Sequence, residues 1–422
     1  MLYRISVLIE LIVVIIATFP LLQYSDPPRT DEVESVRAYT RQIEFDYIRW
    51  SLDAMMTKLK AGSINLPFSV DKASQKFIVM EYLQITNLVM DRENKLEQIY
   101  SDPNIQDKQT ASASLRADLE ALQVRQTGLA ALSEAVIQEQ VGEILNEIEL
   151  TSLGQPIPFV LYHASPVPRA LIVSRRERIE QVANISIDSS LTINEQSVLE
   201  KNVDQGLDFS SLVVGIGGIG VYPTMVLTTT DIHWLFETVA HEWTHNYLTL
   251  RPLGLLYDST PELRTMNETT ASIVGTEISN LVLNHYYPEF AAPNSANENL
   301  IEWQNYPPDP QPTRPVFDFR TEMHETRVKT DKLLSEGKID EAEAYMESRR
   351  QVFIDNGYVL RKINQAYFAF YGAYADVPGG AAGEDPVGPA VRELRTQSTT
   401  LKEFLDKIAW MTSFEELRSS IN

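Results

Sequence analysis

The spacing of apolar residues changes twice along this 422-residue chain, and these changes limit the folds open to it. From 30 to 150, apolar residues recur at spacings of three and four, which predicts long amphipathic helices with breaks near 62–67 and 101–104. After residue 155, short β-branched runs bounded by Pro, Gly and Ser predict strands. Helical spacing then returns and continues through most of the chain from 322 onward. The pattern therefore predicts an α+β chain with helical regions on both sides of its strands.

Residues 5–22 form an apolar run that only Glu10 interrupts. About 20 apolar residues cross a bilayer as a helix, so this run predicts a transmembrane helix. Arg4 precedes it and acidic residues dominate the segment that follows, which favours an extracytoplasmic location for the rest of the chain. The alternative is a cleaved signal peptide, but no small-x-small cleavage site follows the run. We therefore expect a single-pass membrane protein.

Composition narrows the chemistry that the chain can perform. Its 58 acidic residues outnumber 36 Lys and Arg, and the net charge is -22. Such a surface repels phosphate backbones, so we expect no nucleic-acid partner. Cysteine is absent, which excludes thiol nucleophiles and Cys-type zinc sites. A metal would have to be bound by carboxylates and by some of the six histidines.

Two of those histidines lie four residues apart in His241-Glu242-Trp243-Thr244-His245, within a predicted helix. Side chains at this spacing share one helix face, so both imidazoles can bind one Zn²⁺ ion. Glu242 lies beside that face and can act as a general base toward an attacking water. The pattern predicts a zinc cofactor with His241 and His245 as metal ligands and Glu242 as a catalytic residue. The alternative is a pair of histidines on a helix surface.

A catalytic zinc with two histidines takes a carboxylate as its third ligand and keeps a fourth position for water. A second helix is expected from about Asn267 toward His285, with Glu268 in its first turns. Glu268 is therefore a candidate third metal ligand. Glu262, in a Pro-led loop, and Glu277, further along the helix, are the alternatives.

The HEWTH motif followed by NETTASIVGT resembles the gluzincin metallopeptidases, the thermolysin-like clan, over about residues 205–285. The resemblance implies that His241 and His245 bind zinc, that Glu242 is the catalytic base and that Glu268 is the third ligand. It also implies a zincin-like fold for this part of the chain.

One position departs from the family pattern. The family carries an Asp four residues after the ligand Glu, where it orients a zinc-bound histidine, and this chain has Ser272 there. Groups that hydrogen-bond a metal ligand tune its basicity and the affinity of the site. Asn267 and Thr238 are the candidates to replace the missing Asp.

The predicted architecture is α+β: a zincin-like metallopeptidase core, made of a small mixed sheet and the HExxH helix, between helical N- and C-terminal regions, with one N-terminal transmembrane helix. The predicted segments are 1–29, transmembrane anchor and linker; 30–152, helical region; 153–287, catalytic core; 288–317, Pro/Asn-rich loop; and 318–422, helical region.

The run from Gly215 to Gly220 fits the dinucleotide-binding pattern G-x-G-x-x-G. A dinucleotide site requires a helix directly after these glycines, but strand-like sequence follows them. We expect a strand or bulge that another part of the backbone approaches closely. By the resemblance, the strand expected within 221–230 can pair with an extended peptide.

A peptidase also needs a donor for the oxyanion. A helix expected over 358–375 places several polar side chains on one stripe, and Tyr371 among them is the candidate donor and second catalytic residue. The alternative is ordinary packing of tyrosines in a helical core. The stripe comprises Arg361, Asn364, Tyr367, Tyr371 and Tyr374.

The sequence thus favours a membrane-anchored zinc metallopeptidase that hydrolyses peptides or proteins, with aminopeptidase activity as one option. The alternative is a membrane-tethered helical interaction or scaffold protein with a vestigial zinc domain. The substrate, the cleavage preference and the oligomeric state do not follow from the sequence.

Overall fold

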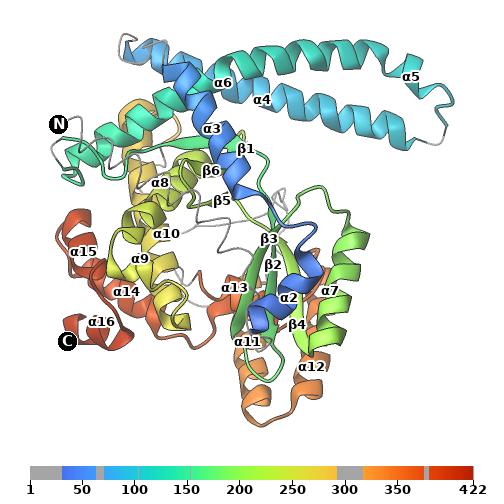
Figure 1. Cartoon of the computed structure of the whole chain (residues 1–422), viewed down its shortest axis with the longest axis vertical. Helices are drawn as coiled ribbons and strands as arrows, with labels where there is room; N and C mark the ends of the chain where they lie inside the picture. Colours follow the sequence, from blue (N-terminus) through green and yellow to red (C-terminus); the bar gives the residue numbers. More distant parts are fainter. Residues whose placement is uncertain are drawn as a thin grey trace, which may run out of the picture.

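The computed structural model is mainly helical, with two small sheets (Figure 1). It describes residues 31–62, 71–102, 104–152, 154–291, 317–374 and 380–421. Of these residues, 64% are helical.

The predicted fold class is therefore wrong. The chain is α-rich rather than α+β, and two separate three-stranded sheets replace the single small mixed sheet. The strands contain only two to seven residues each, whereas single helices reach 30 and 35 residues. The run at 5–22, predicted to be a transmembrane helix, lies outside the described residues. Among the helices that the structure describes, none combines the length and apolar character needed to cross a bilayer.

The N-terminal region forms the expected helices. The two longest, α4 and α6, pack side by side as an antiparallel hairpin that projects from the rest of the molecule (Figure 1). Asp71 caps the start of α4 by accepting hydrogen bonds from the backbone N–H groups of Ala73 and Ser74. The helices are α2 (Glu32–Thr40), α3 (Tyr47–Gly62), α4 (Lys72–Ser101), α5 (Lys108–Ala111) and α6 (Ala113–Glu147).

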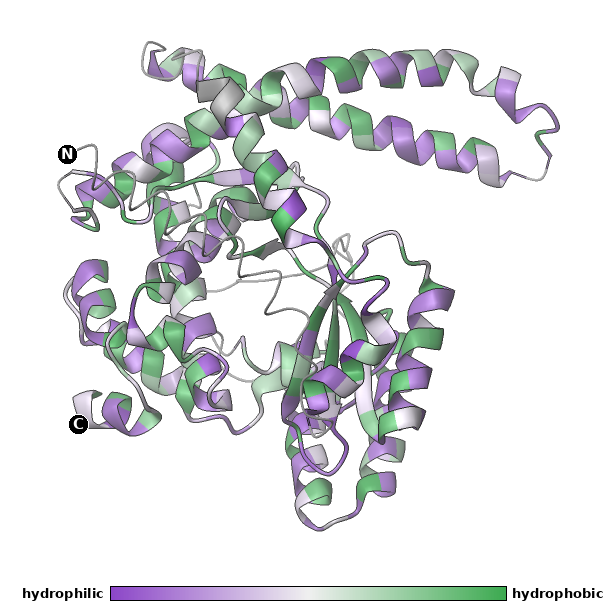
Figure 2. Cartoon of the chain, in the orientation of Figure 1, coloured by the Kyte–Doolittle hydropathy of each residue, from purple (hydrophilic) through white to green (hydrophobic). Residues whose placement is uncertain are grey.

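One sheet is antiparallel, with the strand order β3-β2-β4. Its strands are β2 (Arg169–Arg175), β3 (Gln181–Ile187) and β4 (Phe209–Gly215). They are largely apolar and have a hydrophobic cluster on each face (Figure 2). Helix α7 (Ile193–Leu207) covers one face and begins with a capping box between Thr192 and Glu195. The sequence analysis did not identify β3 or α7.

The other sheet has the order β1-β6-β5 and lies beside the HExxH helix. Its strands are β1 (Tyr162–Ser165), β5 (Gly218–Ile219) and β6 (Thr224–Leu227). Strand β6 is central, parallel to β1 and antiparallel to β5, so β5 is an edge strand. The chain therefore leaves the first sheet at Gly215 and joins the second at Gly218.

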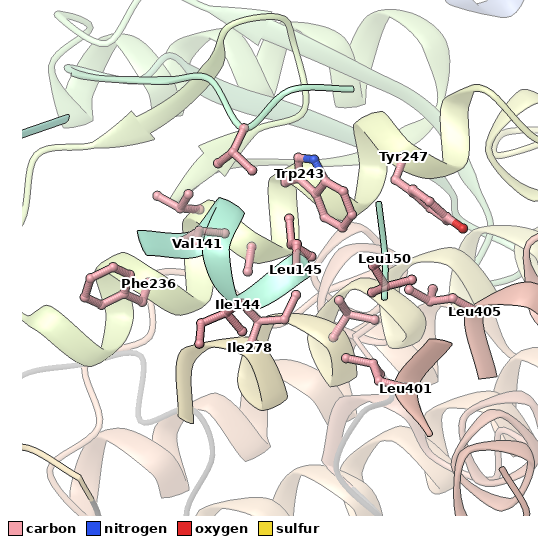
Figure 3. Close-up of a cluster of buried hydrophobic side chains, with 14 of the residues drawn as sticks. Val141, Ile144, Leu145, Leu150, Phe236, Trp243, Tyr247, Ile278, Leu401 and Leu405 are labelled. Atoms are coloured by element: carbon pink, nitrogen blue, oxygen red, sulfur yellow. The ribbon is translucent and has the colours of Figure 1, made fainter. Parts of the chain in front are cut away.

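The largest hydrophobic core surrounds α8 (Ile232–Thr249) and α10 (Pro261–Tyr286) (Figure 3). Phe236 and Trp243 of α8 pack there with Ile278 of α10 and with apolar side chains of α6 and α15. Asp231 caps α8, and Thr260 caps α10 just before a proline at the first helical position. These caps and this core fix the two helices that carry the candidate metal ligands.

The C-terminal region is helical, but the helix expected over 358–375 is much shorter and covers only Gln365–Tyr371. Arg361 and Asn364 precede this helix, because the side chain of Arg361 pairs with Glu200 of α7 and that of Asn364 donates to the Ser211 carbonyl of β4. The helices are α11 (Phe319–Ser335), α12 (Ile339–Asp355), α13 (Gln365–Tyr371), α14 (Val387–Thr396), α15 (Leu401–Ile408) and α16 (Phe414–Ile421), with short α9 (Pro252–Leu255) after α8. Most of the Pro/Asn-rich loop expected at 288–317 lies outside the described residues.

Candidate metal centre

Helices α8 and α10 pack against each other and bring three potential ligands together. The Nε2 atoms of His241 and His245 lie 3.1 Å apart. Oε2 of Glu268 lies 3.5 Å from the first and 3.6 Å from the second. Zinc bonds of about 2.0–2.1 Å in a tetrahedron place its ligand atoms about 3.3 Å apart. The three atoms therefore fit the ligand spacing of a zinc ion.

The Glu268 carboxylate supports this fit, because its two oxygens have different surroundings. Oε1 accepts a hydrogen bond from the hydroxyl of Tyr257. Oε2 is buried and has no hydrogen-bond partner within the part of the chain that the structure describes. An unpaired buried carboxylate oxygen is costly, and a cation bound between it and the two imidazoles would satisfy it.

The charges of these groups are strongly coupled. Burial raises the pKa of the Glu268 carboxyl, but the neighbouring His245 and His241 outweigh burial and hold this pKa well below its usual range. Burial lowers the pKa of His245, yet the carboxylates of Glu268 and Glu242 outweigh it and raise this pKa to about 9. The pocket thus stabilises positive charge beside Glu268, as a cation site requires.

Asn267 takes the place of the missing Asp. Its Oδ1 lies 2.7 Å from Nδ1 of His245, and its Nδ2 donates to the carbonyl oxygen of Leu253 at 3.3 Å. The second bond fixes the amide so that Oδ1 faces the histidine and accepts a hydrogen bond from Nδ1–H. This leaves Nε2 of His245 as the nitrogen that can bind a metal. Of the two residues considered for the role, Asn267 is therefore the one that contacts a candidate ligand.

Glu242 lies beside the ligands and is 7% exposed. Burial raises the pKa of its carboxyl, although His241 and His245 oppose the rise. The glycine-rich run passes directly over it: a Cβ added to Gly218 would lie 2.7 Å from Glu242 Oε1, and one added to Gly220 would lie 2.9 Å from the His245 Cβ. The run does contain a strand, as predicted, but the groups that approach its glycines most closely are α8 side chains and not another part of the backbone.

The residues of the expected polar stripe do not share one environment in the structure. Tyr374 stacks on the His241 ring with 6.5 Å between ring centroids, and Glu268 and Glu242 contribute to raising its pKa after burial. The Tyr371 ring contacts Tyr367 and Phe370 and is 36% exposed. The structure therefore brings Tyr374 to the metal centre. The ring contacts of Tyr371, the candidate predicted from the sequence, are with Tyr367 and Phe370 instead.

The other members of the stripe bond elsewhere. Arg361 forms an ion pair with buried Glu200, and Asn364 caps α13 while donating to the Ser211 carbonyl oxygen. Tyr367 is buried in the hydrophobic cluster beside the β3-β2-β4 sheet.

The alternative third ligands and the remaining histidines have other surroundings. Glu277 forms an ion pair with Arg395, and Glu262 is exposed in the first turn of α10. His163 bonds to Glu134, and His285 stacks on Tyr286. Glu268 is thus the acid that the fold places with the histidine pair.

Tyr257 and Arg264 belong to the surroundings of the site but were missed by sequence reasoning. Tyr257 lies in a turn between short α9 and α10 that gives no periodic signal. Arg264 could have been noticed, because it precedes Glu268 by four residues and therefore shares its helix face. Comparison with known proteins gave no match to a family model, a curated protein or a solved structure.

Proposed function

We propose that this chain is a zinc-dependent peptidase. The observation that carries the proposal is the convergence of His241, His245 and Glu268 on one point, with an unpaired Glu268 oxygen and with Glu242 alongside. A site that only bound a structural metal would use a fourth protein ligand and would need no general base. The gluzincin resemblance of the two motifs supports the same assignment.

Zinc in this site would polarise the scissile carbonyl and lower the pKa of water. Glu242 accepts a proton from the attacking water at its carboxylate and returns it to the leaving amine nitrogen. Its raised pKa suits this exchange, because a general base works best when its pKa approaches the working pH. Asn267 keeps the His245 ring in the orientation and tautomer that binds metal.

Strand β5 is the element best placed to hold an extended peptide. It is an edge strand, and Gly218 lies against Glu242, so a peptide paired with it would run past the catalytic base. The strand expected within 221–230 cannot play this part as proposed from the sequence, because β6 already pairs on both sides.

Tyr374 is the proposed oxyanion donor in place of Tyr371. Its raised pKa keeps the phenol protonated at neutral pH, so it can donate a hydrogen bond to developing negative charge. Tyr374→Phe is expected to lower kcat by about 100-fold, with little change in KM. An equal loss in Tyr371→Phe and none in Tyr374→Phe would return the role to Tyr371.

The function is tested by Glu242→Gln. The variant should keep bound zinc, because Glu242 is not a ligand, and should lose peptide hydrolysis. Glu237→Gln, the same chemical change five residues earlier on α8, is the matched control and should retain activity. Unchanged turnover in Glu242→Gln would refute the assignment.

A scaffold function is the second candidate, and the α4–α6 hairpin is the observation that favours it. Two helices of 30 and 35 residues project from the molecule and offer a long surface to a partner (Figure 1). A vestigial metal domain would not require Glu242 to stay packed beside two histidines. Replacing only the distal part of the hairpin, 92–118, by a short loop separates the functions, because none of the described side chains of that part belongs to the core around α8 and α10. Hydrolysis of a short peptide should survive if the chain is a peptidase.

A further inference from the structure

Arg264 is a partly buried arginine to which the described residues offer no carboxylate partner. It lies on α10 one helical turn before Glu268, so both side chains share one face of the helix. Its Nη2 donates to the Ala369 carbonyl oxygen at a long 3.4 Å, and its Nε is buried without a partner. No ion pair of Arg264 occurs within the described ranges.

Arg264 shares this isolation with Arg169, whose Nε is also buried without a partner among the described residues, although the chain has a net charge of -22. Other partly buried arginines of the same molecule are paired with carboxylates: Arg176 with Glu343, Arg361 with Glu200 and Arg395 with Glu277. A guanidinium has five N–H donors, and leaving most of them unmatched away from water is unfavourable. The arrangement suits a site whose acceptor arrives with a ligand.

A basic side chain at the position of Arg264 does not stabilise α10. It lies near the N-terminus of α10, where the helix dipole favours acidic side chains over basic ones. Asp258 is near enough for Arg264 to lower its pKa against the effect of burial, yet the two form no ion pair among the described residues.

Arg264 lies near the metal centre. It precedes Glu268 by one turn of α10, and its hydrogen bond to the Ala369 carbonyl places the guanidinium beside α13, five residues before Tyr374. Tyr257 bonds to Glu268 and Tyr374 stacks on His241, so the guanidinium, the ligands and the proposed oxyanion donor share one environment. An anion held by Arg264 would therefore lie close to the reacting bond.

We propose that Arg264 binds a carboxylate of the substrate and thereby makes the enzyme selective for peptides with a negative charge close to the cut bond. This inference rests on the proposed function. Four residues of α10 span about 6 Å, the length of about two residues of extended peptide. The carboxylate is the C-terminal one, with release of one or two residues, or an Asp or Glu side chain at an equivalent distance.

A binding experiment separates this inference from the hydrolysis proposal. The full chain carrying Glu242→Gln, loaded with zinc, is titrated calorimetrically with three forms of one peptide: a free C-terminal acid, a C-terminal amide, and an amide with Glu near its end. The same titrations follow in the Arg264→Gln and Arg264→Lys backgrounds. Arg178→Gln, which removes a surface arginine paired with Glu180, is the charge-matched control.

At least one carboxylate peptide should bind about 10- to 100-fold tighter than the neutral amide, as expected for a charge-assisted hydrogen bond. Arg264→Gln should abolish that preference, Arg264→Lys should keep part of it, and Arg178→Gln should leave it intact. The peptide that shows the preference identifies whether the carboxylate is terminal or on a side chain.

Equal binding of all three peptides, unchanged by Arg264→Gln, would overturn the inference even in a chain that hydrolyses peptides. The opposite outcome is a carboxylate preference that Arg264→Gln removes, in a chain whose wild type hydrolyses no peptide. It would support carboxylate binding by Arg264 and reject the peptidase function. Circular dichroism and zinc content of each variant establish that the loss of preference is not a loss of folding.

Discussion

Under the proposed function, Gly218→Ala should abolish peptide hydrolysis while leaving the chain folded and able to bind zinc. The added Cβ would lie 2.7 Å from Oε1, 2.8 Å from Cγ and 3.0 Å from Cδ of Glu242. Favourable contacts between carbon atoms lie at about 3.5–4.0 Å, so the Glu242 side chain must retreat by about 0.7–1 Å. The three atoms nearest to the new methyl group all belong to Glu242, so the displacement falls on the proposed base.

The magnitude follows from that displacement. Moving a catalytic group by about 1 Å lowers the rate by about 100-fold, which corresponds to about 2.7 kcal/mol of activation free energy. Overpacking by one methyl group costs about 1–3 kcal/mol of folding free energy, which is smaller than the total stability of a typical domain. Activity should therefore fall far more than stability.

The assay compares kcat/KM, thermal midpoint and zinc content of the wild type, Gly218→Ala and Gly215→Ala. Gly215 lies three residues earlier in the same glycine-rich run, and a Cβ added there meets no atom within 4 Å. The control should behave as wild type. Wild-type activity in Gly218→Ala would refute the placement of Glu242 as the base, and an equal loss in both variants would show that the effect is a general disturbance of the run.

Three further predictions follow from side-chain contacts in the structure. Asn267→Ala should weaken zinc binding by about 10- to 100-fold, because the His245 ring loses its partner; competition with a chelator measures this, and unchanged affinity would contradict it. His245 is protonated below about pH 9 without metal, so zinc binding at pH 7 should release about one proton from it, as seen by calorimetry in buffers of different ionisation enthalpy. Lys58→Met should cost about 3 kcal/mol in urea denaturation, because the buried Glu134 carboxylate loses its cation; a loss under 1 kcal/mol would argue against that pair.

The raised pKa of His245 also has a consequence for the metal-free protein. Its folded-state value of about 9 exceeds the usual 6.5, so the protonated ring stabilises the fold fully below about pH 6.5. This contribution is lost as the pH rises through about 9. The thermal midpoint of the chelator-treated protein should fall over that interval, and a flat profile would contradict the ion pair with Glu268.

The helices of the site could be predicted from the sequence because their signals are local. Asp231 is a capping residue, and the spacing of His241 and His245 places both on one face of any helix that contains them. The predicted start of α10, near Asn267, is too late, because Thr260 and Pro261 begin the helix where the sequence suggests a loop. The candidate third ligand, Glu268, also has a local signal, because it lies in the motif NETTASIVGT. These features depend on residues within one or two helical turns.

What could not be predicted depends on contacts between distant segments. The apolar run around Gly215 suggested one sheet, but strand pairing is not encoded in periodicity, and the chain changes sheets within three residues. Arg361 fits a helical stripe, yet buried Glu200 requires a cation and draws it away from α13. The choice of Asn267 over Thr238 depends on where the Leu253 carbonyl fixes the amide. Tertiary pairing outweighed local pattern in each case.

The central claim is that His241, His245 and Glu268 form one zinc site, and the metal content of the purified chain tests it most directly. We expect about one zinc per chain in the wild type, a sharp loss in Glu268→Ala and retention in Glu277→Ala, which removes an acid of the same helix that pairs with Arg395 instead. Wild-type protein without zinc after reconstitution, or equal zinc in both variants, would contradict the account.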